Sequence, residues 1–208
     1  YLNGQLLKYV FMVVFTTALS FGLTYMFGYE DEKTEQENEE AEAIIEEETT
    51  GNIPVALQDE TIISPIVGST VALADVNDPV FSSGAMGQGI AIKPTEGVVY
   101  APADAEVTIA FATGHAYGLK TANGAEILIH VGIDTVSMNG EGFDQKVAQG
   151  DKVKAGDVLG TFDAAKIAAA GLEDTTMVIV TNTTDFASVT PVATGSVAKG
   201  DAIIEVKA

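Results

Sequence analysis

The stretch GHAYGLKTANGAEILIHVGID (Gly114–Asp134) contains both histidines of the 208-residue chain, His115 and His130, on either side of an Asn-Gly pair. Asn-Gly is the strongest short hairpin signal, because a type I′ turn needs positive φ at both of its central residues. The residues after it alternate as in a strand with one buried face. The sequence therefore predicts a β-hairpin that carries the two histidines.

Strand alternation predicts which way the side chains around His130 point. Residues two apart on a strand share a face, so the aliphatic neighbours of His130 face the core and His130 lies on the other face. We expect the aliphatic run to hold the imidazole without burying it. The predicted core residues are Ile127, Ile129, Val131 and Ile133, and the predicted companions of His130 are Glu126, Leu128, Gly132 and Asp134.

The length of the hairpin loop decides whether His115 joins His130. A two-residue loop at Asn123–Gly124 makes them diagonal neighbours, and a four-residue loop places them directly opposite. Either register brings them within roughly 8 Å, with Thr113 and Tyr117 on the same face. A three-residue loop or a bulge would separate the faces. We expect one of the two registers that unite the histidines.

Short strands are expected over most of Ile53–Ala208. Gly and Pro recur at short intervals between runs rich in Val, Ile and Thr, a pattern typical of an all-β sandwich or barrel. One short helix is expected at Asp163–Ala170, before a glycine in a usual C-cap position. Gly-Asp turns within Val147–Phe162 and Val197–Val206 indicate two related hairpins.

The residues before this region divide into an apolar and an acidic segment. Tyr9–Tyr29 has 21 uncharged residues, enough for a helix of roughly 30 Å, the thickness of a bilayer's hydrocarbon core. A secretory signal peptide fits less well, because the apolar run is long and no A-x-A site follows it. Because the sequence starts with Tyr, we expect residues 1–29 to hold the last transmembrane helix of a longer chain.

The acidic segment is Glu30–Asn52, which contains a single lysine. It cannot bury enough apolar surface to fold, so we expect a disordered, self-repelling linker. The whole chain has a net charge of −20 and no cysteine. Such a charge argues against nucleic-acid binding. The lack of cysteine excludes a disulfide, a cysteine-ligated zinc ion and a cysteine nucleophile.

The histidine pair is compatible with three chemistries. A metal site needs three or more ligands, and His115, His130 and Asp134 supply a thin set. Acid–base hydrolysis needs a nucleophile or a positioned water, and the chain lacks a G-x-S-x-G motif. A histidine that carries a phosphoryl group fits better. Neutral imidazole is a good nucleophile near pH 7, and His115 with the Thr113 hydroxyl would steady the phosphoryl oxygens.

Three stretches carry a resemblance to a known family: Ile63–Thr108, TGHAYGLKT (Thr113–Thr121) and GAEILIHVGIDTVSMNGEGF (Gly124–Phe143). They resemble the glucose-type IIA domain of the phosphoenolpyruvate-dependent sugar phosphotransferase system. The resemblance implies a flattened antiparallel β-sandwich, of the barrel-sandwich hybrid kind, over residues 53–208. It implies neither a cofactor nor a metal ion.

The resemblance also implies roles for single residues. His130 would accept a phosphoryl group from phospho-HPr and pass it to a cysteine of a IIB domain, which must lie elsewhere because this chain has no cysteine. His115 would support the phosphoryl group without being phosphorylated, and Thr113 fills the threonine position of the same motif. The residues that match the family's partner-docking rim are Asp78, Val80, Phe81, Phe111 and Asp134.

The order of the segments resembles permeases of the β-glucoside, sucrose and trehalose branch, which run IIB–IIC–IIA. Residues 1–29 would then end a IIC domain in the cell membrane of a bacterium, residues 30–52 would be the linker, and the IIA domain would face the cytoplasm. The alternative is a sugar–cation symporter with a C-terminal IIA-like regulatory domain. Sugar recognition would lie in the IIC part.

Overall fold

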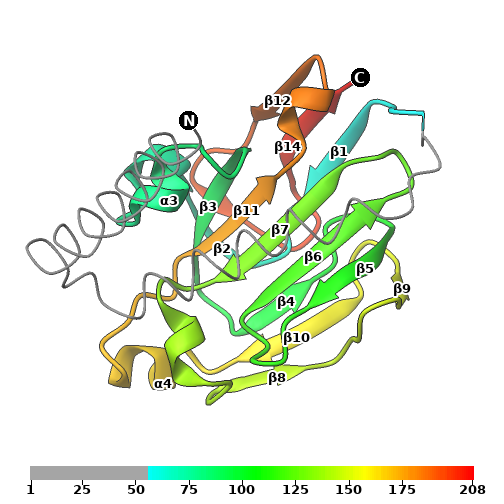
Figure 1. The fold of residues 1–208 in the computed structure, drawn as a ribbon. Helices are drawn as coiled ribbons and strands as arrows, with labels where there is room; N and C mark the ends of the chain where they lie inside the picture. The colour runs from blue at the N-terminus through cyan, green and yellow to red at the C-terminus, as the bar shows by residue number, and fades with distance from the viewer. Residues whose placement is uncertain (1–55) are drawn as a thin grey trace, which may run out of the picture. The chain divides into compact units, whose positions relative to one another are not determined.

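A computed structural model describes residues 56–208 of the chain (Figure 1). The predicted membrane helix at Tyr9–Tyr29 and the predicted linker at Glu30–Asn52 lie outside the described residues. Among the residues described, no helix has both the length and the apolar character needed to cross a membrane.

The described residues form three antiparallel sheets. The large sheet has eight strands in the order β13 (Ser196–Val197), β2 (Gly68–Ala72), β3 (Gln88–Pro94), β11 (Thr176–Val180), β7 (Glu126–Val131), β6 (Ala116–Thr121), β5 (Ala105–Ala110) and β9 (Lys152–Val153). The smaller sheets are β1 (Glu60–Ile63), β14 (Ala202–Lys207) and β12 (Ser188–Pro191), and β4 (Val98–Tyr100), β10 (Val158–Phe162) and β8 (Phe143–Gln145).

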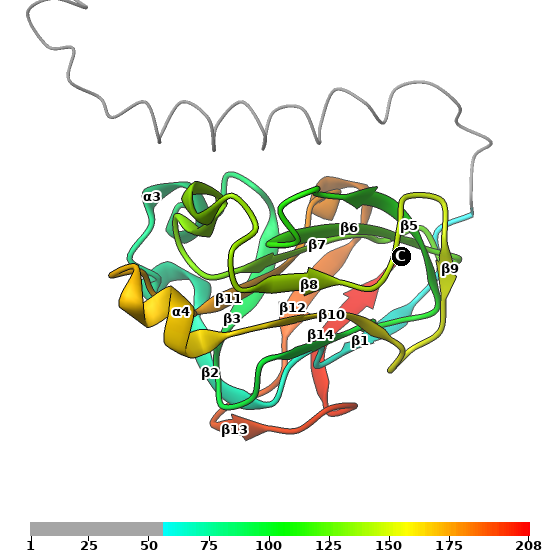
Figure 2. The same cartoon turned by 90° about the horizontal axis from the view of Figure 1, so that it is seen from below.

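The sheets pack in two layers. Figure 2 shows β6 and β7 in one layer and β10, β14 and β1 in the other. Short helices cover the ends: η2 (Leu73–Asp75), α3 (Pro79–Ser82), η3 (Thr135–Met138), α4 (Ala164–Ala169) and η4 (Thr183–Asp185). This architecture confirms the predicted all-β antiparallel sandwich.

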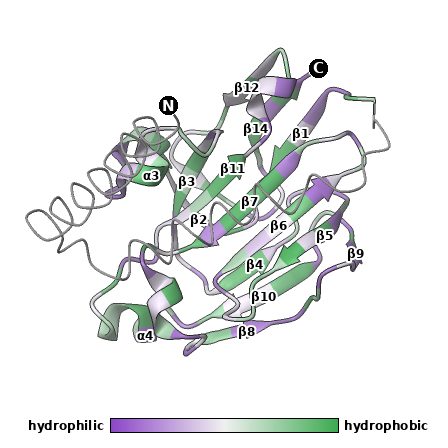
Figure 3. Ribbon diagram, viewed as in Figure 1, coloured by the Kyte–Doolittle hydropathy of each residue, from purple (hydrophilic) through white to green (hydrophobic). Residues whose placement is uncertain are grey.

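The core between the layers follows the predicted alternation on β7. Ile127, Ile129 and Val131 belong to the core cluster, together with Leu159 of β10 and Ile204 of β14. Figure 3 shows the resulting contrast between hydrophobic residues on β7 and β11 and hydrophilic ones on β8 and β9. Ile133, the last residue predicted to face the core, is buried but lies beyond the end of β7 and outside that cluster.

The predicted register of the β6–β7 hairpin is wrong. Ala116 pairs with His130 and Lys120 with Glu126, which leaves a loop of three residues, 122–124. Gly124 has φ of +98°, as the last residue of a three-residue hairpin loop requires.

Contacts from distant residues hold this loop. The Glu60 carboxylate accepts hydrogen bonds from the Thr121 hydroxyl at 2.7 Å and the Ala125 N–H at 3.3 Å. The Gln58 N–H donates to the Asn123 carbonyl at 3.1 Å. The new register also moves Tyr117 from the predicted histidine face into the core, where it is 1% exposed.

The predicted Gly-Asp turns are present, two of them within Val147–Phe162, but the two predicted hairpins are wrong, because the strands on either side of each turn pair with other strands: β9 with β5, β13 with β2, and β14 with β1 and β12. In each turn the aspartate carboxylate accepts the N–H of the residue three positions earlier, at 2.8 to 2.9 Å, and the glycine has φ near +90°. The predicted helix is α4, whose N-cap is Asp163 and which is followed by Gly171 with φ of +80°. The three turns are 148–151, 154–157 and 198–201.

Candidate functional site

His130 lies near the end of β7, on the face turned away from the core, as predicted. It pairs with Ala116 of β6 on one side and Met177 of β11 on the other. The side chain is more covered than predicted, with 8% of the residue exposed. The aromatic ring of Phe81, from α3, stands 5.1 Å from the imidazole between centroids, so a distant segment provides the cover.

The contact between His115 and His130 does not follow from strand alternation. In the observed register His115 is opposite Val131, whose N–H it accepts at 2.8 Å, so a regular strand would turn its side chain to the core. Instead His115 precedes β6 and follows Gly114, which has φ of +70°. The two imidazole centroids are 5.0 Å apart with the rings nearly perpendicular. The structure therefore brings the histidines together despite the wrong register.

A backbone hydrogen bond determines the tautomer of His130. Nδ1 lies 2.9 Å from the carbonyl oxygen of Gly132. A carbonyl oxygen only accepts, so Nδ1 carries the proton of the neutral ring. The lone pair is then on Nε2, which makes this nitrogen the nucleophilic one of the ring.

The Thr113 hydroxyl bonds His115. Its Oγ1 lies 2.5 Å from Nδ1 of His115. A hydroxyl can donate or accept, so it suits either tautomer of the ring. When Thr113 donates, the proton of His115 is on Nε2 and this ring becomes a hydrogen-bond donor beside His130.

Burial keeps both imidazoles neutral. Desolvation lowers the pKa of His115 to about 3, and the nearby His130 adds to the effect. Desolvation also lowers the pKa of His130, partly offset by the Gly132 carbonyl and by the charges of Asp78 and Asp134. Both rings therefore favour the neutral form, with a single N–H, at pH 7, the state in which a histidine is a nucleophile.

Four of the predicted rim residues, Asp78, Phe81, Phe111 and Asp134, lie beside the pair. Asp78 is the N-cap of α3, and its Oδ1 accepts the N–H groups of Val80 at 2.7 Å and Phe81 at 3.2 Å. This cap fixes the helix that places Phe81 over His130. Phe111 lies against His115 with 5.3 Å between ring centroids, and Asp134 follows the Gly132 turn with φ of +58°. Val80 is half-buried on α3.

The described part of the chain offers no set of side chains that could bind a metal ion. Residues 56–208 contain no group of three or more His, Cys, Asp or Glu side chains that could hold a metal ion. His115, His130 and Asp134 therefore do not form a metal-binding group in the structure.

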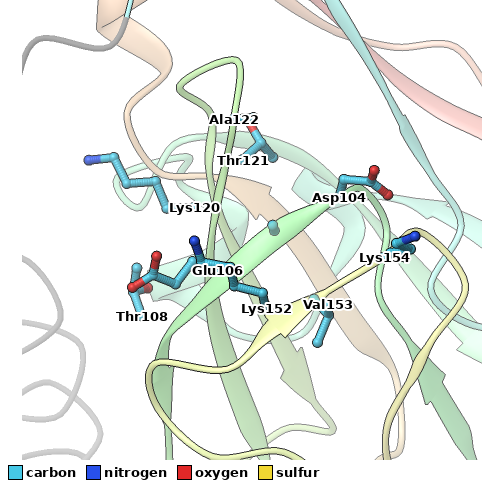
Figure 4. Close-up of a pocket in the computed structure, with 10 residues that line it drawn as sticks. Asp104, Glu106, Thr108, Lys120, Thr121, Ala122, Lys152, Val153 and Lys154 are labelled. Atoms are coloured by element: carbon cyan, nitrogen blue, oxygen red, sulfur yellow. The ribbon is translucent and has the colours of Figure 1, made fainter.

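A groove of about 520 Å³ lies on the outer face of β5, β6 and β9, near the loop end of the hairpin (Figure 4). Three of its lining residues, Lys120, Glu106 and Lys152, stand opposite one another on neighbouring strands, and Lys120 also pairs with Glu126 of β7. Lys120 Nζ is 2.7 Å from Glu126 Oε1. Opposite charges on neighbouring strands stabilise a sheet, so strand pairing accounts for these charged side chains, and neither histidine lines the groove.

Comparison with known proteins agrees with this geometry. Residues 60–186 match the family described as "phosphoenolpyruvate-dependent sugar phosphotransferase system, EIIA 1". The chain belongs to this EIIA family. Its domain is therefore a phosphoryl carrier of a phosphotransferase system.

The relatives include both fused and separate EIIA proteins. The β-glucoside-specific EIIBCA component of Dickeya chrysanthemi is 43% identical over 192 residues, which cover 90% of this chain and 30% of that protein. The glucose-specific EIIA component of Bacillus cereus is 49% identical over 60% of this chain and 76% of its own length. This chain thus spans less than a third of the fused relative.

A solved EIIA structure has the same fold. The glucose permease IIA from Mycoplasma capricolum is 34% identical, with a TM-score of 0.66, over 71% of this chain and 96% of that one.

Two groups beside His130 were not predicted from the sequence. One is the Gly132 carbonyl, which bonds His130, and the other is Thr135, which packs against Gly132. The signal for the first is the glycine two residues after the histidine, at the end of a predicted strand, where a positive φ is common. No sequence pattern shows which carbonyl an imidazole meets.

Proposed function

We propose that this EIIA domain carries a phosphoryl group on Nε2 of His130, which it takes from phospho-HPr and passes to a cysteine of a IIB domain. The observation that carries the proposal is the bond from Nδ1 of His130 to the Gly132 carbonyl, which leaves the Nε2 lone pair for attack on phosphorus. The phosphorus–nitrogen bond of the donor histidine breaks as the bond to Nε2 forms. That bond breaks in turn as a phosphorus–sulfur bond forms on the cysteine thiolate.

His115 and Thr113 would hold the transferred group. With Thr113 donating to Nδ1, the Nε2–H of His115 would donate to a phosphoryl oxygen. Because burial keeps His115 neutral, it would offer a hydrogen bond without a full positive charge. Such a donor would stabilise the phosphoryl group during transfer without binding it so tightly that its release is slowed.

The rim would exclude water and orient the partners. Phe81 and Phe111 flank the two imidazoles, and Val80 lies beside Phe81 on α3. The negative charges of Asp78 and Asp134 next to this apolar centre suit a partner with basic side chains. They would also stabilise the phosphorylated His130 ring, which carries a positive charge while Nδ1 stays protonated.

The domain would be the C-terminal part of a membrane permease. Similarity to the β-glucoside EIIBCA relative extends over 192 residues, more than residues 56–208 can supply, so it includes residues before the described domain. This supports a division into the end of a IIC domain (1–29), a linker (30–52) and the EIIA domain (53–208). It favours a permease of a bacterial cell membrane, with the EIIA domain on the cytoplasmic side, over the symporter alternative.

Phosphorylation of the 208-residue chain tests the proposal. We expect phosphoenolpyruvate, Enzyme I and HPr to place one acid-labile phosphate on His130. His130→Ala should take none, whereas His115→Gln should accept phosphate but pass it to a IIB cysteine at a rate lower by about tenfold or more, from loss of one stabilising donor. Label on His115, or label that persists in His130→Ala, would overturn the proposal.

A further inference from the structure

The peptide unit between Gly132 and Ile133 is held from both sides. A trans peptide is planar, so its C=O and N–H groups point in opposite directions. The Gly132 carbonyl accepts the Nδ1 proton of His130 at 2.9 Å. The Ile133 N–H donates to the Glu173 carbonyl, also at 2.9 Å. The direction of this one peptide therefore sets which nitrogen of His130 keeps the lone pair.

Thr135 contacts the peptide units around Gly132 with both branches of its side chain. Its hydroxyl donates to the Val131 carbonyl at 2.5 Å, which holds the peptide unit that precedes Gly132. Its methyl group packs over Gly132 so closely that a Cβ on that residue, at φ of +80°, would collide with it. Thr135 itself is 0% exposed, so solvent cannot replace its hydroxyl.

We propose that Thr135 is a positioning residue for phosphoryl transfer. The hydroxyl and the methyl group together keep the Val131–Ile133 turn in the conformation in which the Gly132 carbonyl meets Nδ1 of His130. Without the hydroxyl, the buried Val131 carbonyl loses its hydrogen-bond donor. The turn then changes conformation so that this carbonyl can accept another hydrogen bond. The Gly132 carbonyl then moves away from His130, and the proton distributes between the two nitrogens. This inference rests on the proposed function of His130.

Nitrogen NMR and transfer kinetics on the 208-residue chain test this role. We expect the wild-type His130 ring to show a protonated Nδ1 and a bare Nε2 at pH 7. Thr135→Val keeps the shape and removes the hydroxyl, so the ring should become a mixture of tautomers. Phosphoryl acceptance from phospho-HPr should fall by about three- to tenfold, the effect of one lost hydrogen bond. Thr135→Ser keeps the hydroxyl and should retain the wild-type tautomer, with a rate within about threefold of wild type.

Ser64→Ala is the matched control. Ser64 is also 0% exposed, and its hydroxyl donates to the Ile66 carbonyl at 2.6 Å in the connection between β1 and β2. It should lower stability as Thr135→Val does, and leave the tautomer and the rate unchanged. If Thr135→Val does not fold, Thr135→Ala removes the same hydroxyl without adding an apolar branch and must show the same mixture.

A wild-type tautomer and rate in the folded Thr135→Val chain would overturn the role of Thr135, as would a change no larger than that of Ser64→Ala. Failure of the proposed function looks different, because His130 of the wild-type chain would then take no phosphate. The tautomer measurement does not depend on phosphorylation and decides the role of Thr135 in either case.

Discussion

His115 and His130 differ in the group that bonds Nδ1. A carbonyl, which can only accept, bonds Nδ1 of His130, whereas a hydroxyl, which can donate or accept, bonds Nδ1 of His115. The first contact fixes a tautomer, and the second allows the ring to adapt when a phosphoryl group arrives or leaves. The same residue type is thereby suited to carry the group in one position and to support it in the other.

The burial of His115 predicts acid sensitivity. In the unfolded chain its pKa is about 6.5, and in the folded chain it is about 3. The unfolded state therefore binds more protons below pH 6.5, and the free energy of unfolding falls as the pH falls from 6.5 toward 3. The expected contribution is at most about 1.4 kcal/mol per pH unit. Urea unfolding at pH 7.0, 6.0 and 5.0 measures it.

His115→Gln is the control for this prediction, because glutamine does not titrate. The variant should lose free energy of unfolding less steeply between pH 6.5 and 5 than the wild-type chain. Equal slopes in the two chains would show that His115 is not held neutral by folding.

For single residues, the sequence indicated which side chains carry the chemistry, but not which distant residues pack around them. The alternation of aliphatic residues around His130 was sufficient to place His130 on the face away from the core. The coverage by Phe81 was not predictable from alternation, because α3 is far away in sequence and its position depends on tertiary packing. The same holds for the Glu173 carbonyl behind Ile133.

At the scale of elements, the β6–β7 hairpin shows why local rules gave the wrong register. The preference of Asn-Gly for a two-residue loop is a local one. At the start of the domain, the Gln58 N–H donates to the Asn123 carbonyl in the loop, and the Glu60 carboxylate accepts from the Thr121 hydroxyl beside it. These bonds favour a three-residue loop. His115 still contacts His130 because it follows Gly114, which has a positive φ. The side chain of His115 therefore does not follow the alternation of strand β6. The predicted contact between His115 and His130 was thus confirmed, but it results from the backbone at Gly114 and not from the predicted register.

The turn after β7 can be tested against a turn elsewhere. Gly150→Ala changes a glycine with φ of +90° and no atom within 4 Å of an added Cβ, so it should cost about 1–2 kcal/mol from backbone strain alone. Gly132→Ala adds a collision with Thr135 and a contact of 2.7 Å with the Glu173 oxygen. It should cost more stability and also slow phosphoryl acceptance. Chemical unfolding and transfer rates of both variants check this, and equal effects on the rate would contradict it.

On the scale of the whole molecule, charge is the dominant property. The net charge is −20, and the lysines near the hairpin loop are matched by carboxylates across the strands. A basic carrier protein should therefore be attracted to the chain as a whole as well as to the rim of the site.

Salt should weaken that attraction. Raising the NaCl concentration from about 0.05 to 0.5 M shortens the screening length severalfold, so kcat/KM for phospho-HPr should fall by about tenfold or more while kcat changes little. Steady-state transfer measured at several salt concentrations tests this, with thermal unfolding followed under the same conditions. A kcat/KM that does not depend on salt would contradict electrostatic attraction.

The proposed phosphoryl transfer depends most on which nitrogen of His130 reacts, and nitrogen-15 and phosphorus-31 NMR of the phosphorylated 208-residue chain measures this directly. We predict phosphorus bonded to Nε2, with Nδ1 still protonated and hydrogen-bonded to the Gly132 carbonyl. Phosphorus bonded to Nδ1 would contradict the account, because that nitrogen could then no longer donate to Gly132.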